Sequence, residues 1–199
     1  MTTATRPVLV VLAGPNGAGK STLFATRIAP SLSVPFINAD DIQRHELGDR
    51  SVDAAYAAAR IAAARRTTHL ETRKSFATET VFSHPSKLDL IHDARTRGYR
   101  IMLFHVGVAL ADLSVARVAE RVKEGGHPVP EDKIRARYAR NGPLIRQAVL
   151  ISDVAHVFDN SALNCPPERI LSFRSGRLSF VAARVPDWAL RLYGPDLGR

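Results

Sequence analysis

Short apolar runs alternate with longer segments of mixed polarity along this chain. The apolar runs are bounded by glycine, proline or charged residues, which is typical of buried strands. They predict strands over Val8–Ala13, Pro35–Ala39, Phe76–Glu79, Arg100–Val106, Ala155–Phe158, Arg169–Phe173 and Arg177–Val181. The mixed segments are rich in helix formers. They predict helices over Lys20–Ile28, Ser51–Lys74, Ser86–Arg97, Asp112–Glu124, Glu131–Val149 and Pro186–Tyr193.

Alternating strands and helices predict an α/β fold, a three-layer sandwich around a mostly parallel sheet. Ser175-Gly176 lies between the last two strands and predicts a hairpin turn. We expect a single domain over residues 1–199, with a helical lid at about 112–150 and a C-terminal hairpin and helix at about 165–199. The pattern does not determine the order of the strands in the sheet.

The composition narrows the class of protein. A chain of 199 residues with 45% hydrophobic residues is long and apolar enough to fold around a full core. A single cysteine, Cys165, excludes a disulfide scaffold and a multi-cysteine zinc site. The apolar runs are far shorter than the roughly 20 residues that cross a bilayer, and the polar start Met1–Pro7 does not resemble a signal peptide. We therefore expect a cytoplasmic protein without a membrane partner.

The charge balance favours anionic partners. Lysine and arginine total 28 against 19 acidic residues, which gives a net charge of +9. The basic residues are mostly arginines spread through predicted helices, without a lysine-rich tail. Nucleic acid, acidic lipid and phosphorylated small molecules are all partners of this kind, and on charge alone an ordinary solvated surface is favoured over nucleic acid binding.

A complete phosphate-binding motif follows the first predicted strand. The motif G-x-x-x-x-G-K-[ST] is matched by Gly14-Pro15-Asn16-Gly17-Ala18-Gly19-Lys20-Ser21, and Thr22 follows it. Glycines let the backbone turn its N–H groups toward phosphate oxygens. Lys20 is placed to reach the β- and γ-phosphates, and the Ser21 hydroxyl to hold Mg²⁺. The motif predicts binding of a nucleoside triphosphate, ATP or GTP, together with Mg²⁺.

The use of the triphosphate is indicated by what surrounds the motif. Switches and motors that hydrolyse ATP usually carry an acid at the end of an apolar strand. The strand Arg100–Val106 ends in His105-Val106-Gly107, without an acid. This absence and the small size of the chain favour a kinase that phosphorylates a small molecule.

Two adjacent carboxylates follow the second predicted strand, in Phe36-Ile37-Asn38-Ala39-Asp40-Asp41. Ligands of open α/β sheets bind outside the carboxyl ends of the strands, where a carboxylate can accept a hydroxyl proton. Aspartate also caps helices. We expect Asp40 to be the base and Asp41 the cap.

A further pair of polar residues, Glu79-Thr80, follows the third predicted strand. Glu79 is a candidate for binding a substrate hydroxyl or for the outer shell of Mg²⁺, and an ordinary loop acid is the alternative. Thr80 is the neighbouring candidate for substrate binding.

Arginines recur in the two predicted helices that flank Gly125-Gly126. Arg117 and Arg121 are four residues apart and share one face of the first helix, and Arg135, Arg137 and Arg140 follow on the second. Two arginine-bearing helices joined by a glycine turn predict a lid that neutralises phosphoryl charge and excludes water. The alternative is a solvated face, since acids are interleaved with the arginines.

The sequence resembles the zeta toxin family of P-loop kinases. The likeness is carried, in chain order, by Gly14–Thr22, Phe36–Asp41, Phe76–Thr80, Arg121–Pro130 and Asp159-Asn160-Ser161. The resemblance implies a nucleotide-kinase-like core that uses ATP or GTP to phosphorylate a hydroxyl of a UDP-activated amino sugar such as UDP-N-acetylglucosamine. By analogy it also implies an antitoxin as partner.

The resemblance also assigns roles. Lys20 matches the phosphate lysine, and Asp40 matches the base, because it takes the place of the second acid in I-D-x-D. Asn38 replaces the first acid. Glu79 matches the substrate-contacting acid, and Arg121, with Arg117, matches the first lid arginine.

Two further assignments follow from related kinases. In nucleotide kinases the earlier of two such arginines stacks on the base, so Arg117, Asn160 and Ser161 are expected to border the base and Arg121 the phosphates. The second lid arginine falls on His127 when aligned through Val129-Pro130, or on Arg135 or Arg137 when aligned through the helix.

The sequence thus predicts a zeta-type kinase with a UDP-amino sugar as acceptor. A kinase for another small molecule, such as an antibiotic, a sugar or a nucleoside, is one alternative. A P-loop NTPase that binds nucleic acid is the other, and the charge of +9 supports it.

Overall fold

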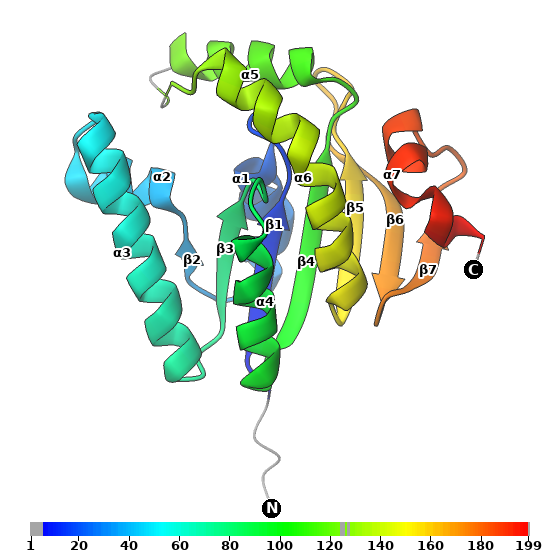
Figure 1. Cartoon of the computed structure of the whole chain (residues 1–199), viewed down its shortest axis with the longest axis horizontal. Coiled ribbons are helices and arrows are strands. Elements are labelled where there is room, and N and C mark those ends of the chain that lie inside the picture. The colour runs from blue at the N-terminus through cyan, green and yellow to red at the C-terminus, as the bar shows by residue number, and fades with distance from the viewer. Residues whose placement is uncertain (1–5, 124–125, 127, 199) are drawn as a thin grey trace, which may run out of the picture.

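A seven-stranded sheet forms the centre of the computed structural model, which describes residues 6–123, 126 and 128–198 (Figure 1). The strand order is β2-β3-β1-β4-β5-β6-β7. Neighbours from β2 to β5 run parallel, while β6 and β7 are antiparallel to their neighbours. The strands are β1 Val8–Ala13, β2 Phe36–Ile37, β3 Phe76–Thr80, β4 Arg100–Gly107, β5 Val154–Asp159, β6 Glu168–Arg174 and β7 Arg177–Val181.

The α-helices of the described residues are α1 Lys20–Leu23, α2 Ala39–Asp41, α3 Val52–Glu71, α4 Ser86–Thr96, α5 Ala111–Lys123, α6 Glu131–Ile151 and α7 Asp187–Leu197. All of them match predicted helices except α2, which was not predicted. The first helix continues as a π-helical segment, Phe24–Ile28. Every predicted strand and helix is found, and the element most shortened in proportion to its predicted length is β2, which ends at Ile37 because Asn38 already caps the next helical turn.

None of the helices within the described ranges combines the length and the apolar character that a bilayer crossing requires. The two longest, α3 and α6, have 20 and 21 residues and both carry charged side chains along their length.

Two hydrophobic cores separate three layers, as predicted. On one face of the sheet Leu9 and Val11 pack in a cluster with residues of α3, α4, α6 and α7. On the other face Val10 and Leu12 pack with Leu23 and the π-helical segment. All four β1 side chains are buried, and burying each contributes about 1.5–3 kcal/mol. Figure 1 shows α3, α4 and α6 in front of the sheet, with α1 behind it.

The C-terminal hairpin also forms where its turn residues place it. Ser175 and Gly176 both have positive φ, 49° and 74°, which a two-residue turn between twisted strands requires. A Cβ on Gly176 would lie 2.5 Å from the carbonyl oxygen of Leu150, so glycine is needed there.

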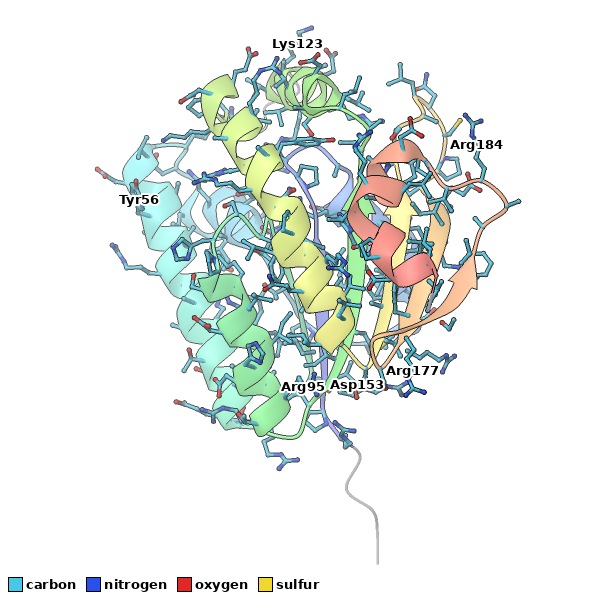
Figure 2. All side chains as sticks on the ribbon, turned by 45° about the vertical axis from the view of Figure 1, so that its right-hand side comes forward. Tyr56, Arg95, Lys123, Asp153, Arg177 and Arg184 are labelled. Carbon is cyan, nitrogen blue, oxygen red and sulfur yellow. The ribbon has the colours of Figure 1, made fainter. Side chains whose placement is uncertain are left out.

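The carboxyl ends of the parallel strands lie at the top of Figure 1, with α5 across them. At the opposite end of the sheet, where Figure 2 labels Arg95 and Asp153, these side chains form hydrogen bonds with the backbone. A carboxylate oxygen of Asp153 accepts the Ile101 N–H at 2.8 Å, and the Arg95 guanidinium donates to the carbonyl oxygen of Ile151. We therefore expect the functional site at the carboxyl ends of the parallel strands.

Candidate active site

The glycine loop after β1 is tightly wound. Gly14 has φ 149° and Gly19 has φ 87°, conformations that favour glycine. A Cβ on Gly14 would lie 2.1 Å from the carbonyl oxygen of Val106, and a Cβ on Gly19 would lie 2.6 Å from Nδ2 of Asn160. The loop therefore tolerates no side chain at either position, which fits a backbone that wraps closely around phosphate.

Lys20 lies at the base of this loop and is 4% exposed. Its Nζ donates to the carbonyl oxygen of Pro15 at 2.9 Å and lies 3.3 Å from Oε1 of Glu79. A buried ammonium needs such partners, because an unpaired charge in the interior is costly. Phosphate oxygens carry the same negative charge as Glu79, and binding of phosphate by Lys20 stays a prediction.

Glu79 contacts two other predicted site residues, Lys20 and Ser21, and also Asn38. Its Oε2 accepts a hydrogen bond from the Ser21 hydroxyl at 2.5 Å and one from Nδ2 of Asn38 at 3.4 Å. Its Oε1 faces Lys20. Because β3 lies directly beside β1, the end of β3 brings this carboxylate to the glycine loop.

The acid beside the loop comes from β3, whereas the preference for a kinase used the absence of an acid at the end of Arg100–Val106. That strand is β4, whose end carries His105 and which lies on the other side of β1. In the sheet it is β3 that supplies the acid, and the sequence could not show which strand neighbours β1 on that side. The missing acid therefore does not separate a kinase from a hydrolase here.

The carboxylates after β2 are arranged differently from the prediction. Asp41 was expected to cap the helix, but Asn38 is the cap: its Oδ1 accepts the N–H of Asp40 at 2.9 Å. Asp40 itself is exposed in the first turn of α2. Burial and the nearby Glu79 carboxylate raise the pKa of Asp41. The prediction failed because asparagine, which replaces the family's first acid, caps as well as aspartate does.

Thr80 serves the loop that follows β3. Its hydroxyl accepts the N–H of Phe82 at 3.2 Å, where Phe82 has φ 56°. Thr80 also lines a cavity of about 330 Å³ between α3 and α4, together with Glu79. Its predicted role in substrate binding stays a prediction.

The structure brings Arg117 and Asn160 together, while their role at the nucleotide base stays a prediction. Arg117 donates to the carbonyl oxygens of Asn160 at 2.7 Å and of Ala162 at 3.2 Å. Asn160 in turn donates to the carbonyl oxygen of Ala18 in the glycine loop at 2.9 Å. Helix α5 is thereby linked through Asn160 to the glycine loop.

Ser161 helps to fix the loop after β5. Its hydroxyl donates to Asp159 at 2.5 Å and accepts the N–H of Ala109 at 2.9 Å. Trp188 of α7 donates to the same carboxylate oxygen at 2.8 Å. The C-terminal helix thus supports the expected base site, a role for Trp188 that no local sequence pattern signalled.

The remaining lid residues fall into different environments. Arg135 is exposed and forms ion pairs with Asp112 at 2.6 Å and Glu131 at 2.8 Å, so it joins α6 to α5. Arg137 is partly buried, three residues after the buried Ile134. Arg121 is partly buried in α5, and its carbonyl oxygen accepts the Gly126 N–H at 2.8 Å. His127 lies outside the described residues.

His105 was not assigned a role by the sequence. It is fully buried, its Nδ1 lies 2.8 Å from the Tyr193 hydroxyl, and burial, assisted by Lys20, lowers its pKa to about 3. A neutral imidazole in this position adds no second positive charge beside Lys20.

A P-loop kinase fold accounts for these features together: a glycine loop after a central strand, a buried lysine, an acid on the adjacent strand, and helix α5 across the strand ends. Comparison with known proteins agrees. The family model "Zeta toxin" matches residues 1–165, so the chain belongs to the zeta toxin family. The hairpin β6–β7 and helix α7 follow the matched region.

Solved structures share this fold. The AvrRxo1-ORF1:-ORF2 complex with ATP has a TM-score of 0.69 at 17% identity, covering 97% of this chain and 64% of that one. A toxin of the PezAT toxin–antitoxin system of Streptococcus pneumoniae has a TM-score of 0.62 at 15% identity, with coverages of 80% and 70%. An uncharacterized protein of Haemophilus influenzae is 32% identical over 63 residues, which are 32% of this chain and 45% of that protein. The chain thus spans less than two thirds of the first and the last of these proteins.

Proposed function

We propose that this protein transfers the γ-phosphoryl group of ATP or GTP to a hydroxyl group of a small molecule. The acceptor that family membership suggests is a UDP-activated amino sugar such as UDP-N-acetylglucosamine. The observation that carries the proposal is the cluster at the loop, where Glu79 contacts both Lys20 and Ser21 at 3.3 and 2.5 Å. These are the side chains that phosphoryl transfer requires beside a triphosphate.

The proposed step breaks one bond and forms another. The acceptor hydroxyl oxygen attacks the γ-phosphorus, the bond to the β,γ-bridging oxygen breaks, and the nucleoside diphosphate leaves. Asp40 accepts the hydroxyl proton, because it is an exposed carboxylate at the start of α2, next to Asn38, which contacts Glu79. Lys20 stabilises the charge that develops on the phosphate oxygens.

The residues beside Lys20 suit a magnesium ion. A serine hydroxyl and a carboxylate 2.5 Å apart present the oxygen donors that Mg²⁺ prefers. Ser21 would hold the ion with Glu79 behind it, and the bound ion would offset the negative charge of the β- and γ-phosphates.

The arginines of the proposed lid have different contacts, which suggest different roles. Arg117 is tied to the loop that follows β5 and is proposed to face the base, while Arg121, one turn later, is proposed to face the phosphates. Of the two candidates on α6, Arg135 already pairs with two acids. Arg137 lies three residues after Ile134 and four before the buried Asn141, on the inward side of the helix, and is the better candidate.

The alternative hypothesis, a P-loop NTPase that hydrolyses ATP, is tested by following the γ-phosphate. Glu79 suits either class, but the cavity beside it favours an acceptor other than water. We expect radiolabelled γ-phosphate to appear in UDP-N-acetylglucosamine when that sugar nucleotide is supplied with ATP and Mg²⁺. Label in a nucleoside or an aminoglycoside instead would keep the kinase and replace the acceptor. Release of inorganic phosphate alone, stimulated by nucleic acid and lost at high salt, would favour the hydrolase.

We also propose that the protein is toxic to bacteria and that it has an antitoxin partner. The PezAT structure describes a toxin–antitoxin system, and this chain belongs to the same family. We expect expression of the chain to arrest bacterial growth and Lys20→Ala to relieve the arrest. Growth that is equally unaffected by both proteins would contradict a toxin.

A further inference from the structure

A cavity adjoins the cluster around Glu79 on the side away from the glycine loop. Helix α3 lines it with residues that recur every three or four positions, Ala63, Arg66, Thr67 and Leu70. The start of α4 lines the opposite side, and the ends of β1 and β3 form the floor. At about 330 Å³ it falls at the small end of the range of ligand pockets.

Arg66 is the unusual residue of this cavity. Its side chain is partly buried, and no ion pair or hydrogen bond of its guanidinium is found within the described ranges 6–123, 126 and 128–198. Burial lowers its pKa, and no carboxylate counteracts this. A guanidinium with five donors is costly to withdraw from water without a partner.

The acids around the cavity do not supply that partner. Glu79 is held by Lys20 and Ser21, and Asp93 pairs with Arg97 at 2.7 Å. Asp89 is exposed on α4. Arg66 therefore presents an uncompensated positive charge to a cavity that opens beside the proposed point of phosphoryl transfer.

We propose that Arg66 binds an anionic group of the acceptor, a phosphate or a carboxylate, in the cavity between α3 and α4. This inference rests on the proposed function, because it treats the cavity as the acceptor site. A planar guanidinium binds both kinds of group through paired hydrogen bonds. It follows that the acceptor carries negative charge, which disfavours uncharged sugars and cationic antibiotics.

The neighbouring residue provides a matched control. Arg65 precedes Arg66 on α3, is exposed, and forms two hydrogen bonds with Glu46 at 2.6 and 2.5 Å. Arg65→Gln and Arg66→Gln therefore remove the same charge from the same helix, one outside and one inside the cavity. A general effect of net charge would appear in both variants.

Binding is tested with small anions on protein whose glycine loop is already filled. The full chain is saturated with a non-hydrolysable ATP analogue and Mg²⁺, and pyrophosphate or malonate is titrated by calorimetry. We expect Arg66→Gln to weaken the preferred anion about 10- to 100-fold, with Arg65→Gln like wild type. Preference for pyrophosphate indicates a phosphate-bearing acceptor, and preference for malonate a carboxylate. Equal binding to wild type and Arg66→Gln, or no binding to either, would overturn the proposal.

Kinetics then separate this inference from the proposed function. With an acceptor that is phosphorylated, Arg66→Gln should raise the KM for the acceptor at least about tenfold and leave the KM for ATP unchanged. If no metabolite accepts phosphate, the proposed function fails, while the anion titration still decides the role of Arg66. An unchanged acceptor KM in Arg66→Gln would refute the role of Arg66 and leave the kinase intact.

Discussion

Replacing Glu79 by glutamine tests the central contact of the site. The substitution keeps the shape of the side chain and removes the charge that faces Lys20, whose side chain is 4% exposed against 18% for Glu79. Lys20 keeps the carbonyl oxygen of Pro15 as a partner, but its ammonium loses its counter-charge. Weakening a charge-assisted contact of this kind costs about 2–3 kcal/mol.

Melting experiments provide the measurement. For a chain of this length, about 2–3 kcal/mol corresponds to a fall in Tm of roughly 4–12 °C. Phosphates bring a new counter-charge to Lys20, so ATP without Mg²⁺ should raise the Tm of Glu79→Gln more than that of wild type. Glu71→Gln, at the exposed end of α3, is the control and should behave like wild type.

The outcome distinguishes two roles of Glu79. If its carboxylate also supports Mg²⁺, the variant should lose turnover even though it binds ATP well, with kcat about a hundredfold lower. A variant with unchanged Tm and unchanged response to ATP would show that the contact with Lys20 contributes nothing, and the reasoning from burial would be refuted.

Three further predictions concern other residues. Asp40→Asn should bind ATP normally but lower kcat about a hundredfold. Asp41→Asn should turn over nearly normally. It should raise the Tm at pH 7 but not below pH 3.8, because the raised pKa of Asp41 makes its ionisation destabilising as pH rises. The reverse ranking of kcat would make Asp41 the base. His105 should stay neutral by NMR from pH 5 to 8. Because its pKa is lowered from 6.5 to about 3, its share of the unfolding free energy should fall by about 1.4 kcal/mol per pH unit as the pH drops from 6.5 toward 3, a slope that a charged His105 would not give. Arg117→Ala should mainly raise the KM for ATP, and Arg121→Ala should mainly lower kcat. Arg137→Ala should lower kcat more than Arg135→Ala. Equal small effects in all four variants would mean that these arginines form a solvated surface.

The strands and helices were predictable because the residue pattern that defines each one lies within its own segment of the chain. The run Val8–Ala13 is apolar on both faces, and the structure buries both against separate cores. The turn Ser175-Gly176 was predictable because it depends on two residues only. Local patterns of this kind survive in the folded chain without help from distant residues.

What the sequence could not show depends on which elements become neighbours. Glu79 reaches Ser21 because β3 lies beside β1, and strand order is not encoded in any single segment. Asn38 took the capping position expected of Asp41, since both residue types compete for it. Arg66 appeared as one of many arginines of a helix, and only packing revealed that it lacks a carboxylate partner among the described residues.

The most direct test of the account follows the γ-phosphate of ATP. Wild type and Lys20→Ala are incubated with γ-labelled ATP, Mg²⁺ and a metabolite extract, and the labelled products are identified by mass spectrometry. The account predicts label in an anionic, hydroxyl-bearing metabolite with wild type, and at least about a hundredfold less with Lys20→Ala. Equal labelling by the two proteins, or label found only in inorganic phosphate, would contradict it.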